Sequence, residues 1–124
     1  MLLWLIGEPK RLSKKARQLI ERASARDGLA IASITLWELA TLAAQRRISI
    51  QGTFANWTSE LLAGSGVAVL DLTPTIAELS TSFGPDYPKD PADQIIGATA
   101  RAHGMPLVTA DSRLLECPLL NCVW

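Results

Sequence analysis

A chain of 124 residues has room for one domain, so we expect a single domain over residues 1–124. Hydrophobic residues make up 48% of the sequence, too many for a disordered chain, and the net charge of zero weighs against a passive nucleic-acid-binding module. No apolar run approaches the roughly 20 residues of a membrane span, and residues 1–7 lack the features of a secretory signal. The sequence therefore predicts a soluble cytoplasmic protein.

In chain order, the first elements are separated by capping residues and glycines. A short helix over residues 2–6 is expected to end at Gly7. Ser13 can cap a helix that runs to about Ala25, with apolar residues on one face and basic residues outside. The pattern then predicts, in order, a strand over 29–33, a helix over 34–47, a helix from Thr53 to about 64–66, and a strand over 67–72.

Two helices in the second half of the chain are predicted from the same N-terminal capping pattern. Thr73 and Asp90 each place a capping side chain before a proline at the first helical position. The remaining predicted elements are a helix from 73 to about 83, a loop over 84–89, a helix over 90–104, a strand over 106–110, a helix over 111–116 and a strand over 121–124. Because the strands are apolar throughout, the fold class is predicted to be α/β, with a parallel sheet covered on both faces.

Three carboxylates occur in apolar surroundings, at predicted junctions between a strand and the helix that follows it. Glu38 is the one charged residue in 34–44, Asp93 shares a helix face with apolar residues, and Asp111 directly follows the strand over 106–110. Ligands of parallel sheets bind beyond the carboxyl ends of the strands, so we expect these side chains to meet there. Clustered carboxylates repel unless a cation lies among them, and oxygen ligands favour Mg²⁺ or Mn²⁺ over zinc. The cluster predicts metal-assisted phosphodiester hydrolysis.

Each carboxylate also has a structural interpretation. Thr35 and Glu38 have the spacing of a capping box. Asp93 is an acid in a first helical turn, where it favours the helix dipole, and Asp111 has the position of an N-cap. For Asp90, the natural N-cap of its helix, the structural interpretation is the favoured one.

The other reactive or aromatic residues are interpreted as structural. Cys117 and Cys122 are expected to be free, buried thiols, because one pair of cysteines with a single histidine does not make a zinc site. His103 is expected at the surface, at a helix C-terminus. Tryptophans expected in the core are Trp4, Trp37 and Trp57, with a dimer face as the alternative for Trp4.

Charge is unevenly distributed along the chain. Seven Lys or Arg residues fall within residues 10–26, whereas residues 71–93 carry five Asp or Glu residues against Lys89. Such a distribution suits an enzyme that gathers a polyanion and holds a cation, and it suits an ordinary solvated helix face equally well. Both interpretations stay open at this point.

Five stretches, in order along nearly the whole chain, resemble VapC-type toxins of the PIN-domain family. They are residues 2–5 with 12–13, 33–40, 70–74, 90–93 with 98–100, and 106–111. The resemblance implies a PIN-like three-layer α/β/α fold with a mostly parallel sheet. It also implies a Mg²⁺- or Mn²⁺-dependent endoribonuclease, the toxin of a type II toxin–antitoxin pair, that acts on RNA, forms a homodimer and binds a VapB-like antitoxin.

The resemblance also assigns individual residues. Glu38, Asp93 and Asp111 match the family's second, third and fourth acids, which are both catalytic and metal-binding. Thr109 matches a hydroxyl that lines the site, and Asp90 is placed as a supporting residue.

The chain departs from the family at its start. The family opens with a central strand that ends in an Asp-Thr-His-like segment, just before a run that matches Leu2-Leu3-Trp4, and Met1 stands where a valine is frequent. The first central strand is therefore truncated or missing, together with the first aspartate, and we expect translation to start upstream of Met1.

Two further hypotheses remain beside an active ribonuclease. A non-catalytic PIN-like module, an antitoxin decoy or degenerate toxin, would explain the missing acid. An unrelated α/β phosphatase or receiver-like domain is disfavoured because the sequence has no phosphate-cradling glycine-rich loop.

Overall fold

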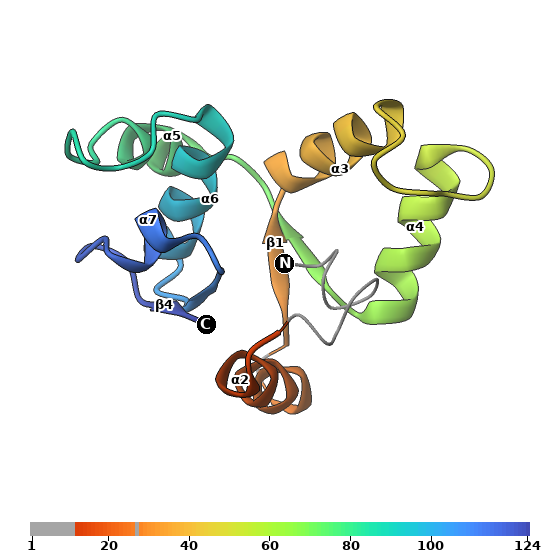
Figure 1. Ribbon diagram of the computed structural model, residues 1–124, viewed down its shortest axis with the longest axis horizontal. Helices are drawn as coiled ribbons and strands as arrows, with labels where there is room; N and C mark the ends of the chain where they lie inside the picture. Colours follow the sequence, from red (N-terminus) through yellow and green to blue (C-terminus); the bar gives the residue numbers. More distant parts are fainter. Residues whose placement is uncertain (1–11, 27) are drawn as a thin grey trace.

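A computed structural model describes residues 12–26 and 28–124 of the chain (Figure 1). The predicted helix over 2–6 and Trp4 lie outside these residues. In chain order the elements are α2 (Lys14–Ala25), β1 (Ala30–Ala32), α3 (Ile34–Ala44), α4 (Phe54–Ser65), β2 (Ala68–Leu70), α5 (Pro74–Ser80), α6 (Pro91–Ala102), β3 (Leu107–Val108), α7 (Ser112–Leu115) and β4 (Cys122–Val123). Every element predicted within the described range is present, although the strands are shorter than expected.

The predicted N-caps form. The Ser13 hydroxyl accepts a hydrogen bond from the Ala16 N–H at 3.0 Å, and Thr53 and Thr73 cap α4 and α5 in the same way. Asp90 caps α6 through its Oδ1 atom, which accepts from two backbone N–H groups of the first turn. These starts are predictable because the cap and the amide that it satisfies lie within three residues of one another.

Helices α3 and α5 end about three residues earlier than the sequence predicts. At the end of α3, Arg46 adopts a left-handed φ of 57°, and the Arg47 N–H bonds the Leu42 carbonyl, which makes a Schellman closure. At the end of α5, three side-chain hydroxyls donate hydrogen bonds to backbone carbonyls of the preceding turn. Ser80, Thr81 and Ser82 each donate to the carbonyl three residues earlier, at 2.6–2.8 Å.

The strands form two parallel pairs. Ala30, Ile31 and Ala32 of β1 pair with Ala68, Val69 and Leu70 of β2, and β3 pairs with β4 over two residues. Helices α3 and α6 both contact β1, and they lie on opposite sides of it in Figure 1. Within residues 12–26 and 28–124 no strand joins the two pairs.

Three groups of side chains form the core. Leu39 and Val67 are buried between α3, α4 and the β1–β2 pair. Leu12, Ala16 and Ile20 attach α2, with Val108 and Trp124 against them. The third group joins α5 to α6, where Ile76, Tyr87 and Ala98 are buried. Among the helices of the described part, none is long and apolar enough to cross a membrane.

The tryptophan and cysteine predictions need correction. Trp37 is 61% exposed, because α3 buries the face of Leu39 and leaves the neighbouring face to solvent. Trp57 is half-buried and contacts Phe54. Cys117 and Cys122 are free, as expected, but half-buried rather than buried.

Gly97 of α6 supports the first testable prediction. A methyl group at this position would overlap the Tyr87 hydroxyl, and Tyr87 itself stacks on Phe83 with ring centroids 4.0 Å apart. Gly97→Ala is therefore expected to lower the free energy of unfolding by about 1–2 kcal/mol, since overpacking outweighs the gain in helix propensity. Urea unfolding measures the change.

Gly64 provides the control for that substitution. It lies in α4, and a methyl group there would meet no atom within 4 Å. Gly64→Ala is expected to leave stability unchanged or to raise it by up to about 1 kcal/mol. Equal effects at Gly64 and Gly97 would show that the contact with Tyr87 does not restrict position 97.

Candidate active site

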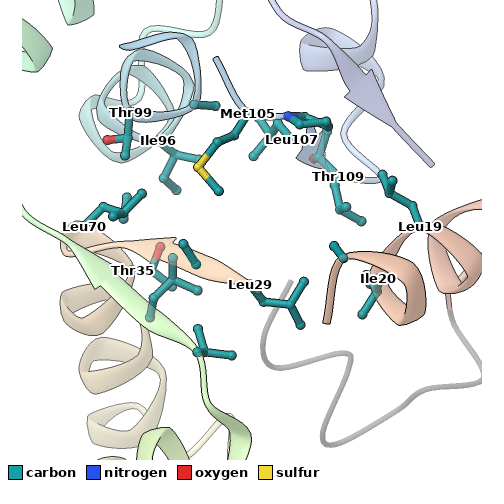
Figure 2. Close-up of a pocket in the computed structure, with 18 of the residues that line it drawn as sticks. Leu19, Ile20, Leu29, Thr35, Leu70, Ile96, Thr99, Met105, Leu107 and Thr109 are labelled. Carbon is teal, nitrogen blue, oxygen red and sulfur yellow. The ribbon is translucent and has the colours of Figure 1, made fainter. Parts of the chain in front are cut away.

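A cavity of about 740 Å³ lies between the two strand pairs. Figure 2 shows Leu29, Thr35 and Leu70 on one side of it, facing Ile96 and Leu107 across the gap. The walls are mainly apolar. Its polar lining residues are Arg22, Arg26, Thr35, Glu38, Asp93, Thr99, Thr109 and Asp111.

All three predicted acids line this cavity. Glu38 lies in the second turn of α3, Asp93 in the first turn of α6, and Asp111 between β3 and α7. Each side chain is half-buried. Helices α3 and α7 follow β1 and β3, as predicted, but α6 follows α5 and a loop, so the prediction of a strand–helix junction at Asp93 is wrong.

Asp93 and Asp111 share one cation, the guanidinium of Arg113. The Arg113 Nη2 atom lies 2.7 Å from Asp111 Oδ2 and 3.7 Å from Asp93 Oδ2. The Nε atom donates a second hydrogen bond to Asp111, at 3.1 Å, which completes a two-pronged contact. The geometry shows that these two carboxylates can converge on a single positive charge.

The carboxylates are electrostatically coupled. Burial, followed by the charges of Asp93 and Asp90, raises the pKa of Glu38. Burial, followed by Asp90 and Asp111, likewise raises the pKa of Asp93, although Arg113 opposes the shift. The hydrogen bond from Arg113 lowers the pKa of Asp111. The neighbouring acids therefore make the charged forms of Glu38 and Asp93 less favourable, a cost that a cation among them relieves.

The carboxylates of the cavity are the candidate metal ligands. In the described part of the chain, no group of three His, Cys, Asp or Glu side chains is close enough to hold an ion. Asp93 and Asp111 nevertheless converge on a cation, and Mg²⁺ is typically held by one or two carboxylates with waters and substrate phosphates. Glu38, Asp93 and Asp111 therefore do not form one three-ligand group as they stand, and the oxygen donors that suit Mg²⁺ or Mn²⁺ are those of Asp93 and Asp111.

Thr109 and Asp90 have distinct positions. Thr109 is buried on the cavity wall, and its hydroxyl accepts a hydrogen bond from the Asp111 N–H at 3.1 Å, which orients the Asp111 backbone. Asp90 is exposed and acts as the N-cap of α6, so its structural interpretation holds. Its charge still contributes to the raised pKa values of Glu38 and Asp93.

The structure also decides among the other structural interpretations. Ser33, not Thr35, precedes α3, and no side chain caps that helix, so the capping-box interpretation of Glu38 is wrong. Asp111 does cap α7, because its Oδ1 atom accepts from the Arg113 N–H at 2.9 Å. His103 is exposed at the end of α6, as expected.

Two residues near the site were missed by the sequence reasoning. Arg113 contacts Asp93 only through the folding of α6 against α7, which no local pattern signals. Tyr87 donates a hydrogen bond from its hydroxyl to the Asp93 carbonyl at 2.6 Å, which fixes the first turn of α6. Burial raises the pKa of the Tyr87 hydroxyl well above its usual value, so it remains a donor.

The basic residues of α2 lie away from the start of α3. In Figure 1, α2 is at the amino end of β1, whereas α3 begins at the carboxyl end. Arg22 and Arg26 nevertheless line the same cavity as Glu38. The cavity therefore has basic residues on α2 and acidic residues on α3 and α6.

Comparison with known proteins shows which family the chain belongs to. The sequence matches the PIN domain family model over residues 1–118. It is 42% identical to Ribonuclease VapC22 of Mycobacterium tuberculosis (strain ATCC 25618 / H37Rv) over 111 residues, which cover 90% of this chain and 82% of that protein. With parallel strands, helices on both sides and acids gathered at one cavity, the chain belongs to the PIN-domain family, among its VapC-type members.

Proposed function

We propose that this protein is a metal-dependent endoribonuclease, the toxin of a type II toxin–antitoxin pair. The observation that carries the proposal is the convergence of Asp93 and Asp111 on one cation, with Glu38 on the same cavity. The name of the relative, Ribonuclease VapC22, supports RNA as the substrate. Hard cations and oxygen ligands suit phosphodiester chemistry.

In the proposed reaction, Asp93 and Asp111 would hold Mg²⁺ or Mn²⁺, and the Thr109 hydroxyl keeps the Asp111 backbone in place. The ion would supply a Lewis acid that stabilises negative charge on the phosphate. Glu38 accepts the proton of the attacking water, because a carboxyl with a raised pKa is a stronger base. Water oxygen bonds to phosphorus, the P–O bond to the leaving strand breaks, and the leaving oxygen takes a proton from solvent, to which Glu38 later returns the proton that it accepted.

The proposal extends to partners and location. A VapB-like antitoxin would cover the acidic cavity, and the toxin would act as a homodimer in the cytoplasm. Each of these statements follows from membership of the VapC-type group rather than from a contact in the structure.

A non-catalytic PIN-like binding module is the second candidate. The observation that favours it is the absence, among residues 12–26 and 28–124, of a compact three-ligand group. Such a module would keep the fold and the antitoxin surface without cutting RNA. The two candidates differ in one measurable property, cleavage that depends on a divalent ion.

Metal removal separates them. RNA cleavage is expected with Mg²⁺ or Mn²⁺, and it is expected to fall to background with EDTA because the carboxylates alone cannot stabilise the phosphate charge. The assay uses this chain and a chain extended by the coding sequence upstream of Met1. If both chains are folded and neither cuts RNA in Mn²⁺, the binding module is the correct assignment.

A further inference from the structure

Arg113 lies between Asp93 and Asp111, where the proposed function places a divalent cation. Its guanidinium is hydrogen-bonded to both oxygens of Asp111, at 2.7 and 3.1 Å, and lies 3.7 Å from Asp93 Oδ2. A divalent ion bound between these carboxylates would meet a positive group already in place. Because like charges repel, the ion and the guanidinium cannot both be held there.

The Arg113 side chain can leave without disturbing the backbone. It is 60% exposed, so the guanidinium would move into water, and exposed ion pairs contribute little to stability. The Arg113 N–H remains bonded to Asp111 Oδ1 at 2.9 Å within the α7 cap. The side chain would therefore stay anchored next to the site after its guanidinium has moved.

A released guanidinium would have a substrate nearby. The acids around the site repel the phosphates of RNA, whereas the planar, two-pronged donor group of arginine matches phosphate oxygens. Arg113 is the arginine that contacts these acids in the described residues. Once freed from Asp111, it would stand beside the acids with its donors unpaired.

We propose that Arg113 occupies the cation position in the metal-free protein and, when a divalent ion displaces it, binds a phosphate of the RNA beside the site. This inference rests on the proposed function, because it requires a metal at Asp93 and Asp111. It makes metal and RNA binding cooperative. The ion releases the group that holds the substrate, and the substrate keeps that group from returning to the acids.

Two binding measurements on Arg113→Gln test the proposal. Mn²⁺ binding, measured by calorimetry without RNA, is expected to become several-fold tighter because the competing guanidinium is gone. Binding of a fluorescent, uncleavable 2′-O-methyl RNA oligonucleotide in Mn²⁺ is expected to weaken about 10-fold, the scale of a lost charge-assisted hydrogen bond. A merely structural role for Arg113 would not move the two affinities in opposite directions.

Arg113→Lys and Arg101→Gln complete the design. The lysine variant keeps the charge without the two-pronged contact, so its RNA affinity is expected to fall between those of the wild type and Arg113→Gln. Arg101 is an exposed arginine near the other end of α6 from Asp93, and its loss is expected to change neither affinity. Circular dichroism verifies that each variant is folded.

The outcomes distinguish this inference from the proposed function. If Mn²⁺ binds the wild type and Arg113→Gln equally well, or binds the variant more weakly, Arg113 does not occupy the cation position. If the variant binds Mn²⁺ more tightly but binds RNA as well as the wild type, the phosphate-binding role is wrong. If Mn²⁺ binds neither protein, the metal site fails and this inference fails with it.

Discussion

Replacing Asp93 by asparagine is expected to abolish RNA cleavage while the protein stays folded. The amide keeps the shape of the side chain but loses the charge that would bind the metal, and a loss of about 10²–10³-fold in cleavage rate is expected. The fold should survive because the Asp93 backbone carbonyl, not its side chain, accepts the Tyr87 hydrogen bond. Cleavage of labelled RNA in Mn²⁺ measures the first effect, and thermal unfolding the second.

The same substitution should not lower stability in the absence of metal. Burial and the nearby acids Asp90 and Asp111 raise the pKa of Asp93, so its charged form is unfavourable in the folded protein. A neutral amide removes that cost. Asp71→Asn, at an exposed position after β2, is the control and is expected to change neither cleavage nor stability.

Two results would contradict this account of Asp93. If the variant unfolds, the side chain has a structural role. If it cuts RNA at the wild-type rate, Asp93 lies outside the reaction, and the cavity is not the active site. Antitoxin binding is expected to stay nearly intact in the folded Asp93→Asn variant.

Replacing Glu38 by glutamine is expected to lower cleavage by about 100-fold and to stabilise the metal-free protein. The pKa of Glu38 in the folded protein is raised above its ordinary value, because of burial and then of the charges of Asp93 and Asp90. The protonated form is therefore favoured by folding, and the charged form costs stability above that raised pKa. Glutamine removes this cost, so the gain is present at pH 7.

The stabilisation of the metal-free protein by Glu38→Gln is expected to depend on pH. As the pH falls through the folded-state pKa of Glu38, the wild-type carboxyl takes up a proton and the advantage of glutamine disappears. Because Glu38 is half-exposed, solvent screens the repulsion, and we expect only about 0.5 kcal/mol at pH 7. Urea unfolding of both proteins at pH 7 and below pH 4.5 measures the difference.

Glu60→Gln is the matched control for Glu38, because Glu60 is exposed on α4. It is expected to change neither cleavage nor stability at either pH. A loss of stability in Glu38→Gln at pH 7 would mean that the Glu38 carboxylate makes a stabilising interaction. The proposed repulsion among the acids would then be wrong.

The elements that the sequence predicts well are those set by neighbouring residues. Ser13, Thr73 and Asp90 cap their helices because each accepts from an amide two or three residues ahead, so the signal and its effect are local. The parallel pairing of β1 with β2 was likewise predictable, since strands that are apolar throughout are covered on both faces.

The structural features that the sequence does not predict depend on contacts between residues far apart in the chain. Trp37 and Leu39 lie in one apolar helix, and only the packing of α3 decides that Leu39 is buried and Trp37 exposed. The separation of the strands into two pairs, with a cavity between them, is set by which backbone edges meet. Local propensity carries no such information.

In the candidate site, too, locally determined features were predictable and contacts between distant residues were not. The positions of Glu38 and Asp111 on segments that follow strands were predictable from the sequence, whereas the approach of Asp93 to their cavity depends on how α6 packs. The role of Arg113 was not readable, because its contact with Asp93 joins α7 to the first turn of α6.

The location of Mn²⁺ in crystals soaked with the ion tests the central claim most directly. An anomalous peak is expected between Asp93 and Asp111, bonded to oxygens of both, with Glu38 facing the ion and the Arg113 guanidinium moved away. A peak elsewhere on the surface, with Arg113 still bridging the two aspartates, would contradict the account.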